Sequence, residues 1–185
     1  MRIYLAGPEV FLPDPASLGA AKKAVCARHG LTGIFPIDAP TPQPSGPPDW
    51  RRIHAACEMH MQGCDALVAN LTPFRGAGAD PGTAYELGYM RALGRPVFGY
   101  THVPGDHRAR VEAAWDGAAW RDAAGMEVED FGLADNLMLE GAIMASGGVL
   151  LRAAAPLAWT DLSLFEACIA EAARLLARPM MQARG

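Results

Sequence analysis

Two carboxylates stand six residues apart, Asp80 and Glu86, in the segment Asp80-Pro81-Gly82-Thr83-Ala84-Tyr85-Glu86-Leu87-Gly88. The spacing of apolar residues in this segment predicts a helix. Pro81 fits the first helical turn, where its missing N–H is not needed, and Asp80 fits the N-cap. Glu86 interrupts a helix surface that is otherwise mostly apolar. By itself this pattern fits either a solvent-facing glutamate or a group with a chemical role.

The position of Glu86 in the chain favours a chemical role. Residues 65–71 form a short apolar run that predicts a buried strand, and residues 72–80 contain the Pro, Gly and Arg of a loop. The helix therefore starts beyond the carboxyl end of a strand, which is the edge where open α/β sheets bind ligands. A first strand over Arg2–Ala6 ends at Gly7, and a glycine there allows a ligand to approach the backbone.

Tyr4 lies inside the first predicted strand. A buried tyrosine hydroxyl needs a hydrogen-bond partner, and a nearby carboxylate would supply one; packing in the core is the alternative. Carboxylates in an apolar crevice suit glycosyl chemistry, in which one attacks or stabilises an oxocarbenium-like carbon and an acid assists the leaving group. The sequence has no GxxxxGK[ST], GxGxxG or GxSxG motif that would indicate phosphate-loop, dinucleotide or serine-hydrolase chemistry.

The remaining chain alternates predicted strands and helices. This pattern predicts an α/β fold with a doubly wound five-stranded parallel sheet, flavodoxin- or Rossmann-like, in the order 2-1-3-4-5, with helices on both faces. Gly7 and the 72–80 loop then meet at the crevice between strands one and three. The predicted strands are 2–6, 31–37, 65–71, 95–100 and 149–151, and the predicted helices are 15–29, 50–63 after an N-cap at Asp49, 81–94, 136–144, and 160–178 with a cap at Thr160 or Asp161 and a stop at Pro179.

Two segments fit no regular pattern. Residues 38–49 contain five prolines and form either a wall over the site or a stiff connection. Residues 101–135 are rich in Ala, Trp and charge, and we expect a variable insertion of short helices or a mobile flap. We treat 1–185 as a single domain that includes this insertion.

Composition excludes several classes of partner. A net charge of −4 provides no basic surface for a nucleic acid polymer. No apolar run approaches the roughly 20 residues of a membrane span, and the N-terminus is no signal peptide. Four cysteines without CxxC spacing indicate reduced thiols and a cytoplasmic protein. The five histidines form no metal motif, so we expect neither a metal nor a cofactor.

The segments 3–8, 65–76 and 80–88 together resemble nucleoside 2-deoxyribosyltransferases, and the resemblance runs in order from Met1 to about Val149. It implies that Glu86 attacks C1′ and holds the sugar as a glycosyl ester. Tyr4 would hydrogen-bond Glu86, and Asp80 would bind or adjoin the sugar 5′-hydroxyl. Asn136 and Met138 resemble residues that those enzymes lend to a neighbouring subunit. The implied partners are a deoxynucleoside, a free nucleobase and further copies of the chain in a homo-oligomer with shared active sites.

One position departs from this family. Members usually carry Asp or Asn eight residues ahead of the position of Asp65, and this chain has Cys57 there, followed by Glu58. Either Glu58 or water would then protonate the departing base, if Glu58 is not simply a surface glutamate. Gly7 and Phe74, which lie at the predicted crevice, complete the expected substrate contacts.

Two alternative functions stay open. One is an N-glycoside hydrolase for nucleoside 5′-monophosphates, disfavoured because the Asp80 carboxylate would repel a 5′-phosphate, although Arg75 supplies a cation in the same loop. The other is a non-catalytic nucleoside-binding protein, supported by Cys57. The sequence does not separate purine from pyrimidine preference.

Overall fold

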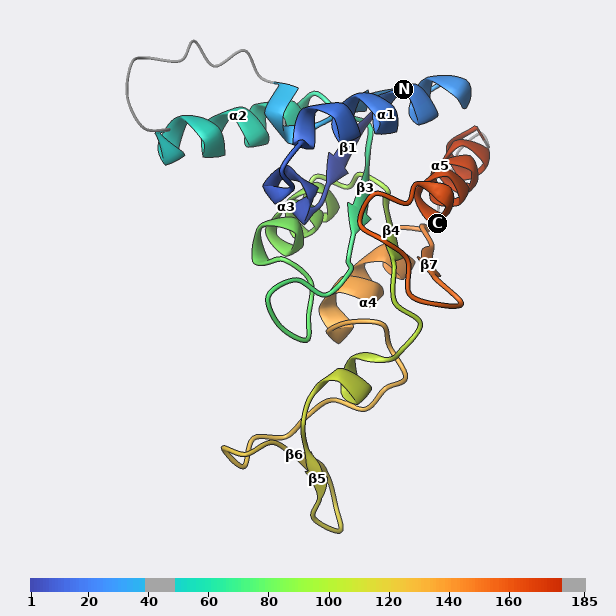
Figure 1. Ribbon diagram of the computed structural model, residues 1–185. Coiled ribbons are helices and arrows are strands. Elements are labelled where there is room, and N and C mark those ends of the chain that lie inside the picture. Colours follow the sequence, from blue (N-terminus) through green and yellow to red (C-terminus); the bar gives the residue numbers. More distant parts are fainter. Residues whose placement is uncertain (39–48, 178–185) are drawn as a thin grey trace, which may run out of the picture.

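The computed structural model describes residues 1–38 and 49–177, and these residues contain a five-stranded parallel sheet (Figure 1). The strand order is β2-β1-β3-β4-β7, which is the predicted order 2-1-3-4-5 with the last strand numbered β7. The predicted doubly wound α/β fold is therefore confirmed. The strands are β1 Arg2–Ala6, β2 Thr32–Ile34, β3 Ala66–Asn70, β4 Val97–Thr101 and β7 Leu150–Arg152.

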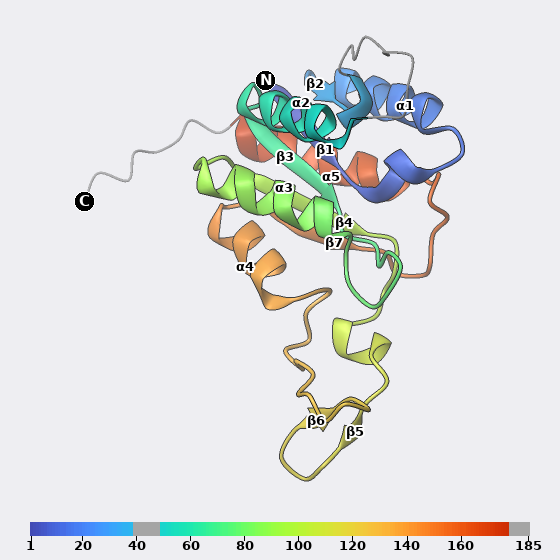
Figure 2. The ribbon, with the colours of Figure 1, turned by 90° about the vertical axis from the view of Figure 1, so that its left-hand side faces the viewer.

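Helices cover both faces of this sheet, as the alternation along β1 requires (Figure 2). Ile3 and Leu5 point to one face and pack in a core with residues of α1 and α5. Tyr4 and Ala6 point to the other face and pack in a core with residues of α2, α3 and α4. The helices are α1 Pro15–Arg28, α2 Trp50–Gln62, α3 Pro81–Ala92, α4 Leu137–Ala145 and α5 Ser163–Leu176, and the short 3-10 helices are η1 Pro8–Phe11, η2 Pro36–Asp38 and η3 His107–Arg110.

Strand β2 is shorter than the predicted 31–37. It ends at Ile34 because Pro36 has no N–H for a strand ladder and begins the 3-10 turn η2 instead. The carboxylate of Asp38 closes this turn by accepting a 2.9 Å hydrogen bond from the Phe35 amide.

The 101–135 insertion contains a short helix, as expected from the sequence, and also a pair of strands that the sequence did not predict. It contains η3 and an antiparallel hairpin of β5 Ala114–Trp115 and β6 Trp120–Arg121, which projects away from the sheet and its helices (Figures 1 and 2). Asp116 shapes the hairpin turn, since one of its carboxylate oxygens accepts from the amides of both Ala118 and Ala119.

The start of α5 also differs from the prediction of a cap at Thr160 or Asp161. The N-cap position is Leu162, which has no side chain to cap the helix. Asp161, one residue earlier, accepts a 2.8 Å hydrogen bond from the Ser163 amide, so it still contributes to the helix start. The predicted helix stop at Pro179 and most of the proline-rich 38–49 segment lie outside the described residues. Within 1–38 and 49–177, no helix combines the length and apolar character needed to cross a membrane.

Candidate active site

The hydroxyl of Tyr4 donates a 2.6 Å hydrogen bond to Oε1 of Glu86. Tyr4 is fully buried in β1, and Glu86 is half-buried on α3, which packs on the same face of the sheet. The pKa of Glu86 is raised to about 7, because burial and, to a smaller extent, the charge of Asp80 raise it by more than the hydrogen bond from Tyr4 lowers it. Burial and the neighbouring carboxylate also raise the pKa of Tyr4, so the phenol stays a proton donor at neutral pH.

Asp80 occupies the predicted N-cap of α3. Its Oδ2 accepts from the Thr83 amide at 2.9 Å and from the Thr83 hydroxyl at 3.0 Å. These bonds hold the carboxylate at the helix terminus, where its charge acts on Glu86. The local sequence explains the geometry, because Pro81 at the first turn and an acceptor at the N-cap both favour a helix start at this point.

The residue that α2 places beside Tyr4 and Glu86 is Cys57. Burial raises the pKa of the Cys57 thiol. A hydrogen bond with Tyr4 lowers this pKa and the charge of Glu86 raises it, and the net effect is a raised pKa. Cys57 therefore contributes an uncharged thiol at neutral pH. Glu58 is engaged elsewhere, since it accepts a hydrogen bond from the Tyr85 hydroxyl and lies 3.5 Å from Nε2 of His54.

Gly7 lies where β1 ends, in tight contact with its surroundings. A Cβ atom at this position would lie 1.9 Å from Oε2 of Glu9 and 3.0 Å from Cβ of Asn70. Alanine at this position would force the Glu9 side chain to shift, so the close packing at the end of the first strand favours glycine.

Phe74 lines an open aromatic pocket of about 330 Å³ at the carboxyl ends of β1 and β3. Its ring stacks on Phe11 with centroids 5.4 Å apart and meets Trp159 edge-on. The guanidinium of Arg75 lies over the rings of both Phe11 and Phe74. Such a pocket offers flat apolar surfaces of the kind on which planar aromatic ligands stack. Its lining residues are Pro8, Phe11, Leu12, Pro73, Phe74, Arg75 and Trp159.

The insertion holds the loop that leads to Asp80. Asp135 accepts a 2.8 Å hydrogen bond from the Ala79 amide. Arg110 donates to the Ala77 carbonyl at 2.8 Å and also to the carbonyls of Gly105 and Ala134. Segments that the sequence pattern left unassigned therefore fix the conformation of the crevice loop.

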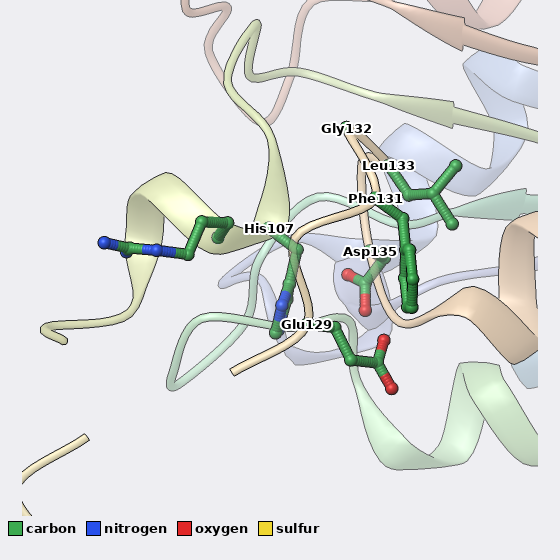
Figure 3. Close-up of a pocket in the computed structure, with 7 residues that line it drawn as sticks. His107, Glu129, Phe131, Gly132, Leu133 and Asp135 are labelled. Atoms are coloured by element: carbon green, nitrogen blue, oxygen red, sulfur yellow. The ribbon is translucent and has the colours of Figure 1, made fainter. Parts of the chain in front are cut away.

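Asn136 forms the N-cap of α4, as its Oδ1 accepts from the Met138 amide at 3.0 Å. Its amide nitrogen donates to Glu129 at 3.1 Å. Glu129 also borders a cavity of about 10 Å³, which Figure 3 shows with His107, Phe131 and Asp135 around it. That volume is close to the minimum for one water molecule, so this cavity is no substrate site.

Met138 is 70% exposed at the start of α4. It borders an apolar groove of about 720 Å³ between α3 and α4, together with Leu87 and Leu137. The structure thus keeps Tyr4, Glu86, Asp80 and Cys57 at one place, and presents Met138 outward from a neighbouring helix.

The sequence matches the nucleoside 2-deoxyribosyltransferase family over residues 3–138, a range that includes Tyr4, Asp80, Glu86, Asn136 and Met138. The chain belongs to this family. The family is one of enzymes that transfer glycosyl groups of nucleosides.

The chain is also similar to individual proteins. An uncharacterized protein from Schizosaccharomyces pombe is 34% identical over 165 residues, covering 79% of this chain and 78% of its own. The structure of a 2-desoxiribosyltransferase from Leishmania mexicana is similar with a TM-score of 0.58 and 31% identity over 75% of this chain and 84% of that one. A conserved protein from Enterococcus faecalis has the same fold, with a TM-score of 0.53 and 21% identity over 83% of this chain and 91% of that one.

Sequence reasoning missed several residues that shape the site. Asp135 and Arg110 lay in the insertion, where no periodic pattern gave their positions. Lys22 and Glu9 form a buried ion pair that the sequence did not reveal. The sequence contained one signal for this ion pair, namely that Lys22 stands among the apolar residues of a predicted helix. Solvent-facing lysines are also common at such positions, so the signal did not identify a buried lysine.

Proposed function

We propose that this chain is a nucleoside 2-deoxyribosyltransferase that moves 2-deoxyribose between nucleobases through a covalent intermediate on Glu86. The observation that carries the proposal is the 2.6 Å hydrogen bond from Tyr4 to a half-buried Glu86 carboxylate. A desolvated carboxylate held by one donor is nucleophilic and has a second oxygen available for attack. Membership of the family supports the same assignment.

The first half-reaction forms the intermediate. A Glu86 oxygen attacks C1′ of a deoxynucleoside, the C1′–N bond breaks, and its electron pair goes to the base nitrogen as the base takes a proton. Tyr4 keeps the attacking carboxylate oriented by donating to Oε1. In the second half-reaction a ring nitrogen of another base attacks C1′, the C1′–O bond breaks with its electron pair returning to the Glu86 carboxylate, and the proton of the incoming nitrogen passes to the group that protonated the first base. Two inversions retain the configuration and give ping-pong kinetics.

The proton for the departing base has two sources in this proposal. A single water molecule held beside the departing base is one. Glu58 is the other source, and the hydrogen bond that it accepts from the Tyr85 hydroxyl must first break. Cys57 is a poor acid for this step, because burial raises the pKa of its thiol.

The aromatic pocket beside Gly7 and Phe74 supports a role in holding a nucleobase, since stacking tolerates any base. We assign the sugar 5′-hydroxyl to the neighbourhood of Asp80. We also propose that Asn136 and Met138 complete the sugar pocket of a second subunit, because the exposed Met138 is free to enter a neighbouring chain. A shared site also excludes bulk water from the face of C1′ that is attacked, so that a base and not water resolves the ester.

Mass spectrometry tests the proposal directly. After incubation with thymidine or 2′-deoxyadenosine and no acceptor base, a deoxyribosyl mass should appear on the peptide that contains Glu86. Glu86→Gln should lose both this adduct and base exchange, by roughly a thousandfold or more. Glu166→Gln is the matched control, because Glu166 lies on α5 and pairs with Arg28 on the surface. Binding of the deoxynucleoside without any adduct or exchange would instead support a non-catalytic binding protein.

One observation favours the alternative of a nucleoside 5′-monophosphate hydrolase. In residues 1–38 and 49–177, Arg75 makes cation–π contacts but no ion pair, so its charge remains available to a phosphate. The Asp80 carboxylate opposes that assignment, since it would repel a phosphate in a poorly solvated site. Release of free sugar phosphate from dAMP without an acceptor, faster than base exchange on deoxyadenosine, would decide for the hydrolase.

A further inference from the structure

A fully buried ion pair lies below the carboxyl ends of β1 and β3, and the proposed reaction does not use it. Nζ of Lys22 on α1 lies 2.5 Å from Oε1 of Glu9 in η1, and both side chains are 1% exposed. The Lys22 ammonium also lies over the rings of Phe35, Tyr100 and Phe165. A buried ion pair is usually no more stabilising than apolar residues of the same volume. Stability alone therefore does not explain why this ion pair is present.

Glu9 connects the ion pair to the end of β3. Its Oε1 also accepts 2.9 Å hydrogen bonds from Nδ2 of Asn70 and from the hydroxyl of Tyr100. Asn70 is the last residue of β3, and Glu9 follows Gly7 by two positions. One carboxylate oxygen thus ties the turn after β1 to the ends of β3 and β4.

Asn70 carries the connection into the crevice loop. Its Oδ1 accepts from the Thr72 amide at 2.9 Å and from the Thr72 hydroxyl at 2.5 Å. The Thr72 hydroxyl oxygen in turn accepts from the His102 amide at 2.9 Å. The next residue, Pro73, lines the aromatic pocket, and so does Pro8, the residue before Glu9. A continuous network therefore joins two chain segments that line that pocket.

We propose that Glu9 and Lys22 are positioning residues, which fix the positions of Pro8 and Pro73 in the lining of the aromatic pocket relative to each other through Asn70 and Thr72. Lys22 keeps Glu9 ionised and immobile, and Glu9 keeps Asn70 in the orientation that directs its Oδ1 to Thr72. The inference rests on the proposed function, because it assumes that the pocket holds the base of the substrate.

The placement of the network predicts a specific kinetic effect. Tyr100, Phe35 and Phe165 belong to the core on the α1 and α5 face of the sheet, whereas Tyr4 and its contact with Glu86 lie on the opposite face. Loosening the network should therefore weaken substrate binding and leave the reacting groups in place. The expected result is a higher KM with kcat largely retained.

Two double variants separate the hydrogen bonds from the charges. Glu9→Leu/Lys22→Met removes both charges and the hydrogen bonds to Asn70 and Tyr100. Glu9→Gln/Lys22→Met also removes both charges, but the glutamine oxygen can still accept from Asn70 and Tyr100. Neither variant leaves a buried unpaired charge. Cys168→Ala is the control for loss of core packing, as Cys168 lies in the same core and outside the network.

Thermal unfolding, steady-state kinetics and calorimetric binding of 2′-deoxyadenosine and thymidine are measured for each variant. The KM and the dissociation constant should rise about tenfold in Glu9→Leu/Lys22→Met, and most of this rise should be absent in Glu9→Gln/Lys22→Met. Cys168→Ala should lower the unfolding temperature without changing KM. Equal KM values in the two double variants, or a fall in kcat alone, would overturn the positioning role.

A further variant tests the proposal even if Glu9→Leu/Lys22→Met does not fold. Thr72→Val keeps the shape of the side chain and removes the hydroxyl that links Asn70 to His102, so KM should rise in the same direction. An unchanged KM in Thr72→Val would also overturn the proposal. Retained deoxynucleoside binding without turnover in the wild type would overturn the proposed function alone, and the dissociation constants would still test the network. Absence of both binding and turnover in the wild type would overturn both.

Discussion

The Tyr4 hydroxyl and the Glu86 carboxylate lie 82 positions apart in the sequence and meet at 2.6 Å between β1 and α3. Two opposite influences act on this carboxylate. Burial raises its pKa to about 7, and the hydrogen bond from Tyr4 limits that rise. Glu86 therefore changes its ionisation nearer to neutral pH than a solvated glutamate does, which makes its reactivity sensitive to the groups around it.

The first prediction concerns the pH dependence of transfer. Only the ionised carboxylate attacks C1′, so kcat/KM should rise with pH through a midpoint of about 7. Tyr4→Phe removes the hydrogen bond that lowers the pKa of Glu86, so the midpoint should move above that of the wild type. Loss of a hydrogen bond to a charged group should also reduce kcat/KM by about 10- to 100-fold.

Base exchange measured from about pH 5 to about pH 9 in the wild type and in Tyr4→Phe tests this prediction. Tyr89→Phe is a suitable control, since Tyr89 lies on the same helix and accepts from Gln62 away from Glu86. A midpoint that falls in Tyr4→Phe would contradict the role assigned to the hydrogen bond.

The second prediction concerns the effect of Glu86 on stability. Its pKa is about 7 in the folded protein and 4.5 in a solvated chain, so the folded state holds the proton more tightly. The stability linked to this group is complete at low pH and decreases as the pH rises through about 7. Glutamine does not ionise, so the advantage of Glu86→Gln over the wild type should grow by about 2 kcal/mol between about pH 5 and about pH 8.

Urea unfolding at the two pH values measures that advantage. Glu166→Gln should not gain stability in the same way, because Arg28 lowers the pKa of Glu166. A constant difference between Glu86→Gln and the wild type at both pH values would show that the carboxylate is not desolvated.

The third prediction separates the two roles of Asp80. Asp80→Ala removes the N-cap of α3 and should lower the free energy of unfolding by about 1 kcal/mol. Asp80→Asn keeps a good N-cap acceptor, so its stability should stay close to that of the wild type. Both variants remove the charge that raises the pKa of Glu86, so the midpoint of the pH profile should move down in each.

Thermal unfolding and pH profiles of the two variants provide the measurement. If Asp80 also binds the sugar 5′-hydroxyl, KM should rise for deoxynucleosides and change less for their 5′-deoxy analogues. Equal effects on both substrates would place the 5′-hydroxyl elsewhere.

The core of this fold was predictable because its signals are local. The strand β1 has its predicted bounds, and α3 begins at Pro81 after the predicted cap at Asp80. Alternating strands and helices with right-handed crossovers then indicate a doubly wound sheet, and the observed order is the one expected for five strands. The topology brings Tyr4 and Glu86 to one crevice and a buried phenol needs a partner, but it was the family resemblance that implied the observed contact between these two residues.

The features that could not be predicted depend on contacts between distant segments. The packing of η1 on α1 decides whether the Lys22 side chain faces solvent or Glu9. No local sequence pattern encodes this packing. Glu58 and Cys57 are adjacent on α2, and a rotation of the helix by one residue decides which of them faces Tyr4. The hairpin of the insertion is stabilised by a cross-strand contact of Trp115 with Trp120, which loop composition does not reveal.

The last prediction concerns sharing of the site between subunits. Met138 is exposed on its own chain, and Asn136 lies beside it at the start of α4. If both enter a partner's site, Glu86→Gln and Asn136→Ala should each have little activity alone, because every site then lacks one residue. A mixed dimer has one site that combines Glu86 of one chain with Asn136 of the other.

The two variants are mixed in equal amounts, unfolded and refolded together. About half of the random dimers are then mixed, and each mixed dimer has one complete site of two. The mixture should therefore regain about a quarter of the wild-type activity. Refolding each variant separately and then combining them at low temperature, where subunits do not exchange, is the control. Activity that stays at the level of the single variants after joint refolding would show that Asn136 acts on the Glu86 of its own chain. In that case the exposed Met138 and the groove between α3 and α4 would not contribute to catalysis in a second subunit.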